Sequence, residues 1–333
     1  MRVIYWGTPQ FAVPSLERLL QEPNIEVLGV VTQPDRRRGR GKEVSPSPVK
    51  SVAIAKGLPV WQPERIKQES LVWEELRSLN SDAFVVVAYG QILPPAILNM
   101  PRLGCINSHG SLLPKYRGAA PIQWALYHGE TETGVTTLLM DRGMDTGDML
   151  LKASIDIDLF DDAQDLALSL ANISADLLLE TLVKLNQQQL QPIPQEAALA
   201  SKAPLLDKAD FNLDWSNSAI SLHNQIRAFT PYCQTQWQQA PLKIIAAAPL
   251  TLEDQPIPEL ERLIKSLVDL DIQSCEPGEV VQIARQKGPI VKTGNGLLLL
   301  RSLQLAGKRP QSGWDFANGL RLRVGEKFQP NPT

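Results

Sequence analysis

The sequence predicts an α/β protein in which a doubly wound parallel sheet is followed by a small β-barrel domain. Strand-like and helix-like segments alternate through the first half, as they do when helices connect parallel strands. Beyond a polar, proline-bearing stretch, short strand-like runs separated by turns indicate a barrel. The length of 333 residues suits about two domains. We therefore expect one domain over residues 1–190, a linker over 191–205 and a second domain over 206–330.

The first half supplies the strands and helices of the expected sheet. Short apolar runs predict strands at residues 3–6, 27–31, 83–88, 105–109 and 135–140. Helices are expected to begin at Thr8 and at Ser47, because each is a capping residue followed by a proline. Apolar spacing predicts further helices at residues 120–127 and 161–185.

The second half differs in composition and charge. Residues 187–195 are polar and contain two prolines, which is typical of a linker. Short strands are expected at residues 278–281, 290–292 and 296–301. The basic tail, residues 280–333, holds nine Lys or Arg against two Asp or Glu, a net charge of +7. Such a tail is either the solvated outside of a barrel or a nucleic-acid-binding face.

Overall composition excludes several classes of protein. The net charge of −3 rules out a uniformly basic nucleic-acid binder. The three cysteines lie far apart and outside any Cys-x-x-Cys pair, which excludes a disulfide scaffold and a zinc ribbon. Three histidines argue against a His-rich metal site, so no metal is expected. No apolar run approaches the roughly 18 residues of a membrane span, so we expect a cytoplasmic protein without a membrane partner. Separately, we expect it to be a monomer.

Two common nucleotide-binding motifs are missing. The segment after the first strand, residues 7–12, lacks the glycine spacing of the dinucleotide fingerprint. Gly41 and Lys42 are followed by Glu43, which offers no hydroxyl for the magnesium ion of a P-loop. A Rossmann-like sheet is therefore expected without the usual nucleotide signals.

Polar residues cluster at the end of the predicted strand 105–109. Asn107 and His109 are two apart, so they share one face of the strand. They stand at its carboxyl end, where open α/β sheets bind ligands. A carboxamide donor beside an imidazole suits oxyanion stabilisation and proton transfer. The alternative is a strand end capped by polar side chains, and position alone favours that alternative.

A second candidate segment follows the strand 135–140. Residues 140–148 contain three aspartates, Asp141, Asp145 and Asp148. A carboxylate at the carboxyl end of this strand would orient the imidazole of His109 or raise its pKa. The alternative is a glycine-rich turn with solvated aspartates, and spacing alone selects none of the three.

A third candidate is the basic loop, residues 36–42, which follows the strand 27–31. It packs five cations into seven residues, and its glycines argue against a helix. The cations are Arg36, Arg37, Arg38, Arg40 and Lys42. The loop is either a solvated surface segment or a flexible arm that grips phosphates near the site.

Several of these segments match one known family. Residues 107–114, followed by 116–122, closely resemble the folate-dependent formyltransferase family. Residues 141–148, ending Met-Asp-Thr-Gly-Asp, resemble the second motif of that family. The likeness runs nearly end to end, because further matches lie at residues 7–9, 32–35, 46–50, 226–229 and 303–308.

The resemblance implies a Rossmann-like formyltransferase domain joined to an OB-like barrel. It implies transfer of a formyl group from 10-formyltetrahydrofolate to the α-amino group of methionyl initiator tRNA, without a metal. By similarity, Asn107, His109 and Asp145 are the catalytic trio. The implied folate-binding residues are Ser111, Leu112, Leu113 and Pro114. The basic loop, and Arg40 above all, is implied to contact the acceptor end of the tRNA.

Two rival functions stay open at this point. A formyltransferase with a small amino-sugar or nucleotide acceptor would keep the trio but would not need the basic loop or the basic tail. A non-catalytic RNA-binding protein would use its barrel alone and would have no affinity for folate.

Overall fold

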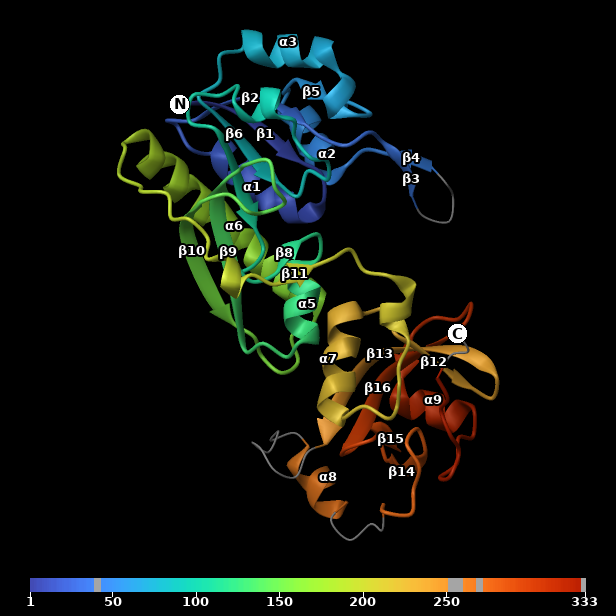
Figure 1. Cartoon of the computed structure of the whole chain (residues 1–333). Coiled ribbons are helices and arrows are strands. Elements are labelled where there is room, and N and C mark those ends of the chain that lie inside the picture. Colours follow the sequence, from blue (N-terminus) through green and yellow to red (C-terminus); the bar gives the residue numbers. More distant parts are fainter. Residues whose placement is uncertain (39–42, 251–259, 268–271, 331–333) are drawn as a thin grey trace. The chain divides into compact units, whose positions relative to one another are not determined.

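The computed structural model describes residues 1–38, 43–250, 260–267 and 272–330 and divides into two compact units (Figure 1). Unit 1 comprises Met1–Ile122, Glu132–Ile157 and Gln164–Pro204. Unit 2 comprises Gln123–Thr131, Asp158–Ala163 and Leu205–Thr333. Two short pieces that precede residue 164 along the chain therefore belong to unit 2.

Unit 1 is built on a seven-stranded sheet with the strand order β10-β9-β7-β6-β1-β2-β5. The strands are β1 (Arg2–Gly7), β2 (Glu26–Val31), β5 (Val60–Trp61), β6 (Ala83–Val87), β7 (Cys105–His109), β9 (Glu132–Leu139) and β10 (Met149–Asp156). Neighbouring strands from β5 to β7 are parallel. The chain fills the sheet outward from β1 in one direction and then from β6 in the other. The predicted doubly wound arrangement is thus confirmed for these five strands.

The other edge of the sheet departs from the all-parallel prediction. β9 runs antiparallel to β7, and β10 runs antiparallel to β9. The end of β9 therefore lies beside the first half of β7, where Leu139 pairs with Ile106. Residues 140–148 do follow the carboxyl end of β9, but because β9 is antiparallel they leave the sheet at the edge opposite to the end of β7. The nine residues between β9 and β10 are fewer than the dozen or so that a parallel crossover needs.

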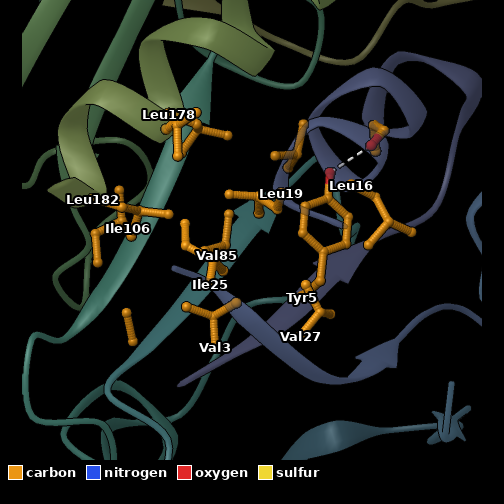
Figure 2. Packing of buried hydrophobic residues seen from close by; sticks show 14 of the residues in the cluster. Val3, Tyr5, Leu16, Leu19, Ile25, Val27, Val85, Ile106, Leu178 and Leu182 are labelled. Atoms are coloured by element: carbon orange, nitrogen blue, oxygen red, sulfur yellow. Dashed lines mark hydrogen bonds between the residues drawn. The ribbon is translucent and has the colours of Figure 1, made fainter. Parts of the chain in front are cut away.

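Helices cover both faces of this sheet because successive strand residues point to opposite sides. They are α1 (Val13–Leu20), α2 (Pro48–Ala55), α3 (Ser70–Ser78), α4 (Pro95–Leu98) and α6 (Ala163–Asn186), whereas most of α5 (Pro121–Tyr127) belongs to unit 2. Val3 and Tyr5 are buried in one cluster with residues of α1, α2 and α6 (Figure 2). Ile4 and Trp6 are buried in a second cluster with residues of α3 and α4. The Tyr5 hydroxyl donates to the backbone oxygen of Ala12, so this buried polar atom is satisfied.

The two predicted helix starts have different outcomes. Ser47 caps α2, because its hydroxyl accepts a hydrogen bond from the backbone N–H of Lys50 at 3.0 Å. The start predicted at Thr8 was wrong, since a short 3₁₀ turn intervenes and α1 begins only at Val13. The Thr8 hydroxyl instead donates to the backbone oxygen of Tyr89, which follows β6. A tertiary hydrogen bond has replaced the local cap.

Helix α6 contradicts the expectation that no segment approaches a membrane span. Its length and composition alone would allow it to cross a membrane, but 56% of its most apolar window is buried inside the molecule. Leu166, Leu170, Leu178 and Leu182 are each at most 1% exposed. These leucines are spaced four or eight residues apart, so together they cover one broad face of the helix. Burial of that face in unit 1 accounts for the apolar composition of α6.

Unit 2 is built on an antiparallel sheet with the strand order β12-β13-β16-β15-β14. Its strands are β12 (Gln234–Trp237), β13 (Ala240–Leu250), β14 (Val280–Ala284), β15 (Gly288–Lys292), β16 (Leu297–Leu305) and β17 (Gln311–Ser312), and its helices are α7 (Ala219–Phe229), α8 (Glu261–Ser266) and α9 (Gly313–Gly319). Gln329 pairs with Gln236 of β12, and Lys327 pairs with Glu279, which precedes β14. The C-terminal segment thereby joins the two edges of the sheet, as closure into a barrel requires.

Candidate active site

Asn107 and His109 project from the same face of β7, as strand alternation predicts. Ser108, which lies between them, faces the other side, where its hydroxyl lies 2.6 Å from the hydroxyl of Ser174 in α6. Asn107 is 9% exposed and His109 is 6% exposed. The amide and the imidazole therefore sit in a largely enclosed environment, where hydrogen bonds and charges act more strongly than in water.

The carboxylate of Asp145 lies against this pair. Nδ2 of Asn107 donates to Oδ1 of Asp145 at 3.2 Å. Oδ2 of Asp145 accepts from the backbone N–H of Gly118 at 2.9 Å and lies 3.6 Å from Nδ1 of His109. Sequence spacing selected none of the three aspartates, whereas the contacts single out Asp145.

Asp141 stabilises the conformation of the loop that carries Asp145 through hydrogen bonds within that loop. Its carboxylate accepts from the backbone N–H of Gly143 at 2.9 Å and from the hydroxyl of Thr146 at 2.7 Å. A side chain at Gly147 would place its Cβ 1.9 Å from the backbone oxygen of Leu139, so only glycine fits there. The loop turns tightly enough to bring Asp145 back toward the middle of β7 despite the antiparallel direction of β9.

The hydrogen bonds of His109 define which ring nitrogen is free. Nε2 lies 2.8 Å from the backbone oxygen of Tyr116. A carbonyl oxygen only accepts, so we assign the hydrogen of the ring to Nε2. In the neutral imidazole the lone pair then sits on Nδ1, the nitrogen directed at Asp145. The 3.6 Å between Nδ1 and Oδ2 exceeds hydrogen-bond length, so a neutral ring leaves Nδ1 available as a base.

The loop after β7 holds the residues expected to bind folate. Ser111 and Leu113 are fully buried. The hydroxyl of Thr136 accepts from the backbone N–H of Leu113 at 3.0 Å and donates to the backbone oxygen of Ser111 at 2.7 Å. Leu112 and Pro114 are partly exposed. Ser111 and Leu113 therefore fix the loop from inside, which leaves the other two side chains to meet solvent.

The stretch expected to be a linker is packed on unit 1. Ile193 pairs with Met149, and β11 (Lys202–Ala203) pairs with β8 (Arg117–Gly118). Gln195 lies beside the loop that carries Asp145, where its Nε2 donates to two backbone oxygens, those of Asp145 and Gly147, at 2.8 and 2.7 Å. Sequence reasoning missed Gln195, because a glutamine in a polar, proline-bearing stretch carries no local signal.

The basic loop begins as a hairpin in which β3 (Arg36–Arg38) pairs with β4 (Glu43–Ser45). Arg40 and Lys42 lie outside the described residues. The base of the hairpin is anchored by Asp35, whose carboxylate accepts from Nζ of Lys50 at 2.5 Å and from Gln62 at 2.8 Å. These two hydrogen bonds hold the pKa of the Asp35 carboxyl below its ordinary value.

The cluster in unit 1 is suited to acyl transfer onto an amine. It presents an amide donor, an imidazole lone pair and a carboxylate in close contact, which are groups for oxyanion stabilisation and proton removal. Within the part of the chain that the structure describes, no group of three or more His, Cys, Asp or Glu side chains is placed to hold a metal ion.

Two of the solved structures that share this fold are named formyltransferases. A sugar 3N-formyltransferase solved with dTDP and 5-N-formyltetrahydrofolate has a TM-score of 0.62 and 19% identity, covering 93% of this chain and 99% of its own. An N-formyltransferase from Helicobacter canadensis, in complex with folinic acid and dTDP-3-aminofucose, gives the same TM-score and identity over 90% and 98% of the two chains. At this identity the likeness shows the fold alone.

Relatives found by sequence have a much higher identity to this chain than these two structures. A protein from Trichormus variabilis named methionyl-tRNA formyltransferase is 60% identical over 328 residues, 98% of each chain. A protein of the same name from Thermosynechococcus vestitus is 55% identical over 333 residues, covering 100% of this chain and 99% of its own. The family model for formyl transferase matches residues 1–182, and the model for the formyl transferase C-terminal domain matches residues 205–321. With both models matched in order and relatives of this identity along its whole length, the chain belongs to the formyl transferase family.

Proposed function

We propose that this protein transfers a formyl group from 10-formyltetrahydrofolate to the α-amino group of methionyl initiator tRNA, giving N-formylmethionyl-tRNA for translation initiation. The observation that carries the proposal is 60% identity over 98% of both chains to a protein named methionyl-tRNA formyltransferase. The cluster of Asn107, His109 and Asp145 in unit 1 supports it chemically. In this proposal the protein works in the cytoplasm as a monomer and needs no metal.

Asn107 stabilises the oxyanion in this proposal. When the amine attacks the formyl carbon, negative charge develops on the formyl oxygen. Nδ2 of Asn107 carries two hydrogens, and only one of them is committed to Asp145. The second hydrogen is free to donate to the developing oxyanion, and Asp145 holds the amide in the orientation that this requires.

His109 accepts the proton of the attacking amine. Its Nε2 is bonded to the backbone oxygen of Tyr116, so Nδ1 is the basic nitrogen. The imidazolium that forms carries its new hydrogen toward the carboxylate of Asp145, which stabilises the charge. The bond between the formyl carbon and N10 of the folate breaks. The imidazolium of His109 gives its new proton to N10, so tetrahydrofolate leaves and His109 returns to its starting form.

Substrate binding is divided between two domains in this proposal. The loop Ser111–Pro114 lines the folate site in a catalytic domain over residues 1–190. The basic loop, with Arg36, Arg37, Arg38, Arg40 and Lys42, and the basic tail contact the tRNA, the tail from a domain over residues 206–330. Lysines and arginines on two surfaces attract one phosphate backbone.

The deciding experiment mixes the full chain with methionyl initiator tRNA and 10-formyltetrahydrofolate labelled on the formyl carbon. We expect label on the amino acid of the charged tRNA. A parallel reaction with a nucleotide-linked amino sugar tests the small-acceptor alternative, and a folate titration tests the non-catalytic alternative. Label on the sugar alone, or no folate binding, would overturn the proposal.

A further inference from the structure

We infer that Gln195 is a positioning residue that holds the carboxylate of Asp145 in place for the reaction. The inference rests on the proposed formyl transfer. Gln195 lies 50 residues beyond Asp145, past the whole of α6, in a stretch whose composition suggests only a linker. It is partly buried and uses its amide on three partners within unit 1.

The amide of Gln195 reaches the backbone on both sides of Thr146. Its Nε2 donates to the backbone oxygen of Asp145 at 2.8 Å and to that of Gly147 at 2.7 Å. Its Oε1 accepts from Nε of Arg117 at 3.0 Å. The guanidinium can only donate and the two carbonyls can only accept, so the partners fix the orientation of the amide. The Gln195 amide thus uses both N–H donors and its oxygen.

The catalytic loop needs such a support. Asp145 has a backbone φ of +55°, a left-handed conformation that L-residues rarely adopt. Its neighbours Asp141 to Met144 are exposed, so little packing restrains the preceding part of the loop. Two hydrogen bonds from one rigid amide hold the backbone on either side of the turn. They act on the backbone that carries the carboxylate and leave the carboxylate itself free for Asn107 and His109.

The same side chain also reaches the strand that orients the catalytic groups. Arg117, which donates to Gln195, lies between Tyr116 and Gly118. The backbone oxygen of Tyr116 holds Nε2 of His109, and the backbone N–H of Gly118 holds Oδ2 of Asp145. Gln195 therefore links the loop of Asp145 to the segment that fixes both of its partners. Displacing the carboxylate by about 1 Å would be enough to lower turnover on the order of 100-fold.

The test is a double-mutant cycle on the full chain. We expect Gln195→Ala to lower kcat on the order of 10- to 100-fold while KM for both substrates stays within about threefold. If Gln195 acts through Asp145, adding Gln195→Ala to Asp145→Asn should lower kcat no further than Asp145→Asn alone, within about twofold. Gln195→Glu keeps the shape but removes both donors, so it should lower kcat as Gln195→Ala does. Gln191→Ala, an exposed glutamine in the same stretch, is the matched control and should keep full activity.

A second measurement does not need the reaction. Amide hydrogen exchange at residues 140–148 should be faster in Gln195→Ala than in the parent chain and unchanged in Gln191→Ala. Unchanged exchange in Gln195→Ala would overturn the inference, whether or not the parent chain formylates tRNA. A parent chain that formylates no tRNA would instead overturn the proposed function. Decreases in kcat that multiply in the double variant, or a Gln195→Ala variant with unchanged kcat, would also overturn it.

Discussion

Two polar side chains on one face of β7 meet a third polar group that comes from a loop 38 residues further along the chain. Asn107 holds Oδ1 of Asp145, and Oδ2 of Asp145 faces Nδ1 of His109. Sequence spacing could predict the shared face of Asn107 and His109, since strand periodicity is local. Spacing could not choose Asp145, because the conformation of residues 140–148 decides which aspartate meets the pair. It could not find Gln195 either, because the hydrogen bonds of Gln195 join segments that are 50 residues apart in the sequence.

The pair gives a direct prediction about turnover. Asn107→Ala and His109→Ala should each lower kcat on the order of 100-fold or more, because each removes a group that acts on the transition state. Folate affinity should change little. Ser108→Ala is the matched control, since Ser108 lies on the same strand but faces α6. Steady-state kinetics check the prediction, and near-normal turnover in Asn107→Ala would rule out its oxyanion role.

A second buried histidine predicts how stability depends on pH. Burial lowers the pKa of His223 from 6.5 to about 4. The cations Arg227 and Arg301 add to this effect, whereas the backbone oxygens of Leu159 and Ala247, which face the two ring nitrogens, favour the charged form and offset burial only in part. The folded state therefore keeps this ring neutral over a pH range in which the unfolded chain takes up a proton.

The free energy of unfolding of unit 2 should consequently fall as the pH drops from about 6.5 to about 4. Between these values the unfolded state binds one more proton at His223 than the folded state does. In a His223→Gln variant this part of the pH dependence should be missing. Denaturant unfolding of both proteins at pH 7 and pH 4.5 checks it. Equal decreases in stability in the two proteins would show that His223 is not the group responsible.

Most elements follow from local patterns, whereas their pairing does not. The runs at residues 3–6, 27–31, 83–88 and 105–109 became β1, β2, β6 and β7 with shifts of one residue at most at either end. The direction of β9 was missed, because an apolar run carries no information about which way a strand pairs. The start of α1 was missed because the hydroxyl of Thr8 donates a hydrogen bond to the backbone oxygen of Tyr89, 81 residues away along the chain, and does not cap the helix.

The basic loop is an element whose function the sequence predicts sharply. Arg40→Leu should lower kcat/KM for methionyl-tRNA, because it removes a proposed contact to the tRNA. Folate binding and Tm should stay nearly unchanged, because residues 36–42 are too polar and too rich in glycine to pack in a core. The salt dependence of tRNA binding should flatten by roughly one unit of log–log slope for each phosphate that the loop no longer neutralises. Measurements of kcat/KM at two salt concentrations check both effects.

Arg77→Leu provides the control for charge alone, since Arg77 is an exposed arginine near the end of α3. It should leave kcat/KM and its salt dependence as they are in the parent chain. If Arg40→Leu behaves like Arg77→Leu, the basic loop is a solvated surface segment, and the small-acceptor alternative gains support.

At the scale of the whole molecule, the two units are interleaved along the chain. Gln123–Thr131 and Asp158–Ala163 belong to unit 2, although both precede residue 164 in the sequence. Within unit 2, Trp124 packs against Phe229 of α7 with their ring centroids 5.8 Å apart. A catalytic fragment made by cutting after unit 1 therefore keeps these two pieces but removes their partners, so we expect its Tm to be lower than that of the full chain.

The position of the cut decides what such a fragment can do. A fragment ending at Pro204 keeps Gln195 and β11, and it should bind folate but formylate tRNA poorly, because the basic tail with its net charge of +7 is gone. A fragment ending at Gln191 also lacks the Gln195 amide and the pairing of β11 with β8. Residues 140–148 should then exchange their amide hydrogens faster than in the longer fragment, and any residual formylation should fall further.

Folate titration, single-turnover formylation and hydrogen exchange on the two fragments check this order. Formylation by the longer fragment at the rate of the full chain would show that the second domain is not needed to bind tRNA.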